Sequence, residues 1–196
     1  MPSLIFVTHP EVAIDPLVPV PEWPLNAIGR ERMERFADCL AGQGVTAVYA
    51  STERKAMDGA AIVAERLGLS YGTDRDLGEN DRSATGYIAP PEFWQVVEEF
   101  FARPHESVRG WERAIDAQAR VVEAVSRIAR QDGTSGDIVI VSHGGVGCLL
   151  TAHLQNVAIG RESRPSHPGG GCFIVIDRKT LALRQDWRVI EEPSLP

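Results

Sequence analysis

Two apolar runs of strand length, each ending in a hydroxyl residue and a histidine, constrain the fold of this chain most. The first reads LIFVTH and ends at His9, and the second reads IVIVSH and ends at His143. Continuous apolar runs this short are typical of parallel strands whose two faces are both covered by helices. Because ligands bind beyond the carboxyl ends of such strands, we expect both histidines at the binding edge of one sheet.

Strand-like and helical patterns alternate along the rest of the chain, which predicts an α/β fold. The expected strands are Ser3–Thr8, Val45–Ala50, Asp137–Ser142, Cys172–Asp177 and Leu183–Val189. The expected helices are a segment capped by Asn26 that reaches Leu40, then Glu53–Leu67, Pro91–Ala102, Trp111–Arg130 and Gly144–Gln155. We therefore expect a mainly parallel sheet with helices on both faces. Residues 1–196 are expected to form a single domain, with residues 80–110 as a small cap or insert over the site.

Composition and charge limit the partners. The net charge of −7 provides no basic surface, so neither nucleic acid nor an anionic membrane is an expected partner. We expect no secretory signal at the N-terminus, and no apolar stretch approaches the roughly 20 residues that cross a bilayer. The three cysteines are widely spaced and favour a reducing compartment. We expect a cytoplasmic protein that holds any anionic substrate by locally placed cations, and the oligomeric state stays open.

A third strand end brings further polar residues to the same edge. Ser51 and Thr52 follow the strand Val45–Ala50, and Arg54 lies just beyond them. Two histidines, an arginine and the amides at a helix start can hold a phosphoryl group, because imidazole attacks phosphorus and a guanidinium forks onto phosphate oxygens. A carboxylic acid must also protonate the leaving oxygen, and Glu79 is the best-placed candidate. Each residue alone is typical of a structural or surface position, whereas their joint occurrence indicates a site.

Other kinds of site fit the sequence poorly. The chain has neither the GxxxxGK[ST] phosphate loop nor the GxSxG nucleophile elbow. His143 and His153 are ten residues apart and the cysteines are scattered, so no pattern supports a metal site. We expect neither a metal nor a cofactor.

Several segments, in chain order, carry a resemblance to one known family. They are FVTHPEV, PLNAIGRERM, VYASTERKAMDGA, DLGEN, RPHESVRGWERAIDAQARV and IVIVSHGGV. In the same order they resemble the Arg-His-Gly-Glu strand end, the Pro-Leu-Thr…Gly, Ser-Ser…Arg-Ala…Thr-Ala, Leu-x-Glu and Pro-x-Gly-Glu-Ser…Arg-Val stretches, and the Val-Ser-His-Gly-Gly of the histidine phosphatase superfamily. This superfamily is also called phosphoglycerate mutase-like, and its fold is a three-layer sandwich.

The resemblance implies a metal-independent phosphatase that acts on a small phosphorylated molecule through a phosphohistidine. It implies that His9 is the nucleophile and that His143 is a second histidine in contact with the phosphate. Arg54 would be an arginine of the phosphate pocket, and Glu79 the proton donor and acceptor. A phosphoglycerate mutase is disfavoured, because the segment between Glu79 and Ser135 is short for one.

The chain departs from the family beside the nucleophile, where Thr8 replaces the arginine and Pro10 replaces the glycine. Thr8 offers a hydroxyl but no charge, and losing a charged partner in a buried site typically costs about 2–5 kcal/mol. Pro10 lacks a backbone N–H and biases His9 toward an extended conformation.

Other side chains are candidates to replace the missing arginine. Arg30 stands at the start of the first helix and Arg82 lies close to Glu79 in the sequence, so either guanidinium would compensate in the phosphate pocket. His167 is a further candidate for the site. The alternative is a degenerate family member that binds a phosphorylated or other anionic ligand without turnover.

Overall fold

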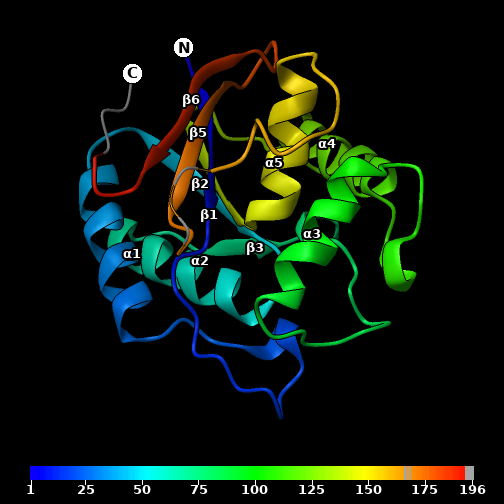
Figure 1. Cartoon of the computed structure of the whole chain (residues 1–196). Coiled ribbons are helices and arrows are strands. Elements are labelled where there is room, and N and C mark those ends of the chain that lie inside the picture. Colours follow the sequence, from blue (N-terminus) through cyan, green and yellow to red (C-terminus); the bar gives the residue numbers. More distant parts are fainter. Residues whose placement is uncertain (166, 168, 193–196) are drawn as a thin grey trace.

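A mixed sheet of six strands, in the order β3-β2-β4-β1-β5-β6, forms the centre of the molecule (Figure 1). The computed structural model describes residues 1–165, 167 and 169–192. The strands are β1 (Ser3–Thr8), β2 (Val45–Ala50), β3 (Tyr71–Thr73), β4 (Asp137–Ser142), β5 (Cys172–Asp177) and β6 (Leu183–Val189). Strands β1 to β4 pair in parallel, whereas β5 is antiparallel to β1 and β6 is antiparallel to β5. The expected mainly parallel sheet is confirmed.

The pairing of β1 with β4 explains why two distant histidines meet. Thr8 lies opposite Ser142 in the parallel register, and the backbone N–H of His9 donates to the carbonyl of Ser142 at 3.0 Å. His9 and His143 directly follow Thr8 and Ser142, the last residues of β1 and β4. They therefore lie side by side at the carboxyl edge of the sheet.

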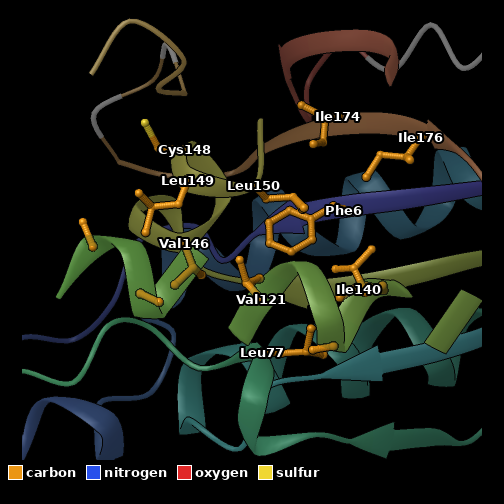
Figure 2. Packing of buried hydrophobic residues seen from close by; sticks show 14 of the residues in the cluster. Phe6, Leu77, Val121, Ile140, Val146, Cys148, Leu149, Leu150, Ile174 and Ile176 are labelled. Carbon is orange, nitrogen blue, oxygen red and sulfur yellow. The ribbon is translucent and has the colours of Figure 1, made fainter. Parts of the chain in front are cut away.

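Helices cover both faces of the sheet. The helices are α1 (Ala27–Leu40), α2 (Arg54–Leu67), α3 (Glu92–Ala102), α4 (Ala114–Gln131) and α5 (Gly144–Leu154), with short 3₁₀ turns η1 (Val20–Glu22), η2 (Arg75–Leu77) and η3 (Val108–Gly110). Alternate residues of a strand point to opposite faces. Ile5 and Val7 of β1 therefore pack in a cluster with α1 and α2. Phe6 packs in the other cluster, with α3, α4 and α5, part of which Figure 2 shows. The layers are those of an α/β sandwich.

Two elements differ from the sequence-based expectation. Strand β3 was not predicted, because its three residues are exposed and it is held by pairing with β2. Helix α4 begins at Ala114 rather than at Trp111. The backbones of Trp111 and Arg113 are extended, with ψ of 156° and 142°, so the helix begins only after them. The indole of Trp111 is instead buried in the core.

None of the helices in the described part of the chain is long and apolar enough to cross a membrane. The assignment of residues 1–196 to one domain stays a prediction, and residues 193–196 lie outside the described ranges. Residues 80–110 contain α3, which forms one wall of a cavity at the carboxyl edge of the sheet.

Candidate active site

His9 and His143 lie in contact at the carboxyl edge of the sheet. Their ring centroids are 5.1 Å apart and their planes are inclined by 69°. His9 is partly buried and lines a cavity of about 710 Å³. His143 is fully buried and caps the N-terminus of α5. The expected convergence of the two histidines is present, although only His9 faces the cavity.

The imidazole of His9 is held in its neutral form. Its Nδ1 lies 2.8 Å from the carbonyl oxygen of Pro10. Because a carbonyl only accepts, Nδ1 carries the hydrogen and Nε2 keeps its lone pair. Burial, together with the charges of His143 and Lys55, lowers the pKa of His9 from 6.5 to about 3. At neutral pH the ring is therefore uncharged.

The glycine loop before β5 packs directly on His9. The N–H of Gly171 donates to the carbonyl of His9 at 3.2 Å. Gly170 has a φ of +71°, and a Cβ on it would lie 2.2 Å from that carbonyl oxygen. Only glycine fits there, because the backbone is left-handed and the approach is too close for any side chain. This contact fixes the backbone that presents the imidazole.

His143 is held from the end of β2. Its Nε2 lies 2.7 Å from the hydroxyl of Ser51 and 3.4 Å from Oε1 of Glu53. Its Nδ1 is buried and has no hydrogen-bond partner within the described ranges. Burial lowers the pKa of His143 in spite of the nearby carboxylates of Glu53 and Glu79. The second histidine is thus a neutral, enclosed group.

The structure does not bring Arg54 into the cavity. Its side chain is 56% exposed and pairs with Asp58 along α2 at 2.9 Å. The next residue, Lys55, is buried instead, because consecutive helical residues are turned by about 100° from each other. Sequence reasoning missed Lys55, although a signal was present: in the family motif the basic residue directly precedes an alanine, and here Lys55 precedes Ala56.

The charge of Lys55 is already balanced by Glu53, a second residue that sequence reasoning missed. The ammonium forms an ion pair with this carboxylate and donates to the carbonyl of Val20 at 2.8 Å. Burial alone would raise the pKa of Glu53, but the charges of His143 and Lys55 lower it to about 2. Glu53 also accepts from the backbone N–H of Glu79 at 2.9 Å and so links the end of β2 to the segment that follows η2.

Glu79 lines the cavity and lies on the N-terminus of α5. Its carboxylate accepts from the N–H groups of Gly145 at 3.0 Å and Val146 at 2.9 Å. Burial would raise the pKa of Glu79, but the charge of Arg82 and these bonds hold it below its usual value. A side chain at position 145 would clash with this carboxylate, because a Cβ on Gly145 would lie 2.5 Å from Oε1 of Glu79. The contact explains why the second residue after His143 is a glycine. Glu79 is therefore ionised at rest.

Of the two arginines proposed to replace the missing one, the structure brings only Arg82 into the cavity. Arg82 donates to Oδ1 of Asn80 from Nε and Nη2, and Nη2 lies 3.4 Å from Oε2 of Glu79. The guanidinium also lies 5.2 Å from the ring centre of Phe93. Arg30 is exposed on α1 and does not line the cavity. Of these two arginines, Arg82 is therefore the one that is available to a phosphate in the cavity.

Thr8 lines the cavity, but its hydroxyl is already bonded within the sheet. It donates to the carbonyl of Cys172 at 3.3 Å and accepts from the N–H of the same residue at 3.0 Å. The hydroxyl thus joins β1 to β5, and the structure does not hold it ready for a phosphate as expected from the sequence.

Apolar and basic residues form much of the rest of the cavity, which Glu11 and Asn26 also line. The apolar wall comes from α3 and consists of Phe93, Trp94, Val97, Phe100 and Phe101. The loop between α5 and β5 contributes Arg161, Arg164 and His167, so His167 reaches the cavity as the sequence suggested. Within the described ranges, no cluster of three or more His, Cys, Asp or Glu side chains is arranged to hold a metal ion.

Comparisons with known proteins agree with this arrangement. A sequence model of the histidine phosphatase superfamily (branch 1) matches residues 7–183. The uncharacterized protein Rv0525 of Mycobacterium tuberculosis is 32% identical over 127 residues, which is 63% of this chain and 62% of that protein, less than two thirds of its length. Among solved structures, YhfR of Bacillus stearothermophilus has a TM-score of 0.78 at 24% identity, over 94% of this chain and 95% of that one. A mycobacterial glucosyl-3-phosphoglycerate phosphatase, Rv2419c, has a TM-score of 0.73 at 20% identity, over 95% and 97%.

Proposed function

Because the chain belongs to the histidine phosphatase superfamily, we propose that it is a metal-independent phosphatase that hydrolyses a small phosphomonoester through a phosphohistidine. The observation that carries this proposal is the state of His9. Its Nδ1 hydrogen is held by the carbonyl of Pro10, its Nε2 lone pair is free to attack, and its ring is neutral at pH 7. Such an imidazole splits one phosphoryl transfer into two easier steps.

In the first step, Nε2 of His9 attacks phosphorus and the bond from phosphorus to the leaving oxygen breaks. The leaving oxygen needs a proton, which Glu79 lacks at rest. A substrate monoanion brings that proton into the site. The pKa of a carboxyl rises beside an anion, so Glu79 takes the proton from the bound phosphate and passes it to the leaving oxygen.

In the second step, water attacks the phosphohistidine while Glu79 accepts its proton, and His9 is released with inorganic phosphate. Arg82 supports the charge on the phosphoryl oxygens in both steps. Nη2 of Arg82 lies 3.4 Å from Oε2 of Glu79, which is a loose ion pair. A small movement of the arginine side chain is therefore enough to bring its guanidinium from Glu79 to the phosphate.

The test is a hydrolysis panel of small phosphomonoesters combined with ³²P labelling from a phosphodonor. We expect turnover and an acid-labile label on the unmodified protein, and neither on His9→Ala. His153→Ala, at an exposed histidine of α5, is the matched control and should keep both. Turnover that survives in His9→Ala would contradict the proposal.

A second candidate function is binding of a phosphorylated ligand without turnover. It is favoured by the Thr8 hydroxyl being bonded to Cys172 and by Lys55 being paired with Glu53. Both observations reduce the positive charge available to a transition state at His9. In this case calorimetry should detect binding of inorganic phosphate while the labelling and hydrolysis experiments give no signal.

A further inference from the structure

One buried arginine joins the two segments that hold the backbone of His9. Arg32 of α1 is 9% exposed and does not line the cavity. Its guanidinium donates from Nη1 to Oε2 of Glu11 at 2.9 Å and from Nη2 to the carbonyl of Gly170 at 3.3 Å. Its Nε forms an ion pair with Glu191, in the turn after β6. Because these charge-assisted bonds are directional and the guanidinium is planar, Arg32 fixes the three segments relative to one another.

The first of the two segments is the loop that begins at His9. Nδ1 of His9 donates to the carbonyl of Pro10, which belongs to the peptide unit between Pro10 and Glu11. The backbone of Glu11 is held by α1, since its carbonyl accepts from the N–H of Asn26 at 3.0 Å. Arg32 holds the side chain of the same residue. Both contacts limit rotation of the peptide unit and so keep the Pro10 carbonyl directed at the imidazole.

The second segment is the glycine loop before β5. The N–H of Gly171 donates to the carbonyl of His9, and the carbonyl of Gly171 accepts from the N–H of Ile190 at 3.0 Å. Arg32 contacts the same loop at Gly170. It also lies against Gly171, where a Cβ would be 2.7 Å from Nη2 of the guanidinium. The guanidinium and the glycine loop are therefore packed together against the backbone of His9.

We infer that Arg32 is a positioning residue for His9, because it ties together the two segments that fix the tautomer and the direction of the imidazole. The inference rests on the proposed function, in that it treats His9 as the nucleophile. The hydrogen bond that one ring nitrogen makes determines which nitrogen carries the hydrogen. When the Pro10 carbonyl turns away, the ring takes both tautomers, and the tautomer with its hydrogen on Nε2 has no lone pair there for attack.

The test reads the tautomer of His9 by ¹⁵N NMR of histidine-labelled protein at neutral pH, with His9→Gln to identify the signal. The unmodified protein should show one tautomer, with the hydrogen on Nδ1. Arg32→Met removes the guanidinium and keeps a long side chain, and it should shift His9 to a mixture of tautomers. In hydrolysis of phenyl phosphate, kcat should fall by about 10²-fold, as for a misplaced reacting group. KM should change less than about twofold, because Arg32 does not line the cavity.

A second variant keeps the test decisive where Arg32→Met does not fold. Arg32→Lys retains a positive charge between Glu11 and Glu191, so it should fold. Its ammonium lacks the fork that reaches Glu11 and Gly170 together. The tautomer mixture and kcat of Arg32→Lys should therefore lie between those of the unmodified protein and Arg32→Met.

Arg178→Met is the matched control at the opposite edge of the sheet. Arg178 is also 9% exposed, pairs with Asp132 at 3.0 Å and donates to the carbonyl of Gly136 at 2.8 Å. It follows the end of β5 that pairs with the start of β1, far along that strand from His9. Thermal melts should show that Arg178→Met and Arg32→Met are both destabilised. The His9 tautomer and kcat should change in the Arg32 variants and stay unchanged in Arg178→Met.

An unchanged His9 tautomer in the Arg32 variants overturns the inference, and so does an equal tautomer change in Arg178→Met. The outcome can be separated from that of the proposed function, since the tautomer is read without turnover. A tautomer change in the Arg32 variants of a protein that hydrolyses no phosphomonoester would overturn only the catalytic proposal. Hydrolysis whose kcat is the same in the unmodified protein and the Arg32 variants would overturn only the positioning role.

Discussion

At the end of β1 the chain passes into a proline-bearing loop, whereas at the end of β4 it passes directly into α5. The two strand ends follow the same pattern up to that point, an apolar run followed by a hydroxyl residue and a histidine. After β1, Pro10 supplies a carbonyl that holds His9 in the cavity wall. After β4, Gly144 and Gly145 start a helix that encloses His143 completely.

The hydroxyl residues before the two histidines are also used alike. Thr8 bonds to the backbone of β5, and Ser142 donates to the carbonyl of Leu77 at 2.7 Å. The difference therefore lies in the segment after each strand and not in the strand itself. Two motifs that look equivalent thus present one imidazole to the cavity and bury the other behind it.

Removing each imidazole separately should give the largest difference between the two strand ends. His9→Ala should reduce kcat by on the order of 10⁴-fold or more, as loss of a nucleophile does, with little change in stability. His143→Ala should reduce kcat by less than His9→Ala, because His143 is enclosed behind the cavity and supports the site without lining it. It should also cost about 1–3 kcal/mol in the free energy of unfolding, because Ser51 and Glu53 lose a buried partner. Kinetics with urea unfolding measures both, and equal profiles for the two variants would contradict the distinction.

The next largest effect concerns the support of His143 from the end of β2. Lys55→Met leaves Glu53 buried without its cation, which should destabilise the fold by about 3–5 kcal/mol. Arg54→Met is the matched control on the adjacent residue. Its exposed pair with Asp58 is worth less than about 1 kcal/mol, and activity should be unchanged. A loss of activity in Arg54→Met with none in Lys55→Met would restore Arg54 to the phosphate pocket.

The pH profile tests the protonation states of His9 and Glu79, the two groups on the cavity side to which we assign the proposed chemistry. Since the pKa of His9 is about 3, the ring stays neutral and nucleophilic throughout the range from mildly acidic to alkaline pH. The substrate loses its second proton near pH 6, and Glu79 holds none at rest. We expect kcat/KM for an alkyl phosphate to be flat from about pH 5 to 6 and then to fall about tenfold per pH unit. A rise in kcat/KM between pH 6 and 8 would contradict this proton source.

The smallest expected effect concerns the paired hydroxyls. Thr8→Val and Ser142→Ala should each lower the free energy of unfolding by about 1–2 kcal/mol, because each removes buried hydrogen bonds to the backbone. Neither should change the affinity for inorganic phosphate more than about twofold if the hydroxyls only tie the strands together. Phosphate titration and urea unfolding measure the two quantities. A much weaker phosphate affinity in Thr8→Val alone would show that this hydroxyl also serves the ligand.

The amino-acid sequence was sufficient to predict every described strand of the sheet except β3, and the meeting of the two histidines. Apolar runs such as residues 4–7 and 138–141 are short and uninterrupted, which only a strand covered on both faces explains, and parallel strands deliver their carboxyl ends to one edge. The helices followed in the same way from periodicity and from caps such as Asn26. Local patterns of this kind act over a few residues, so the sequence displays them directly.

The side chains that complete the site depend on tertiary packing. Arg54 and Lys55 are neighbours in sequence, and the direction in which α2 packs turns one outward and buries the other with Glu53. Likewise, Arg82 rather than Arg30 reaches the cavity, because the segment after Glu79 folds back over the sheet edge toward α3. The direction of a long charged side chain depends on packing between elements distant in sequence, and a local pattern carries no information about that packing.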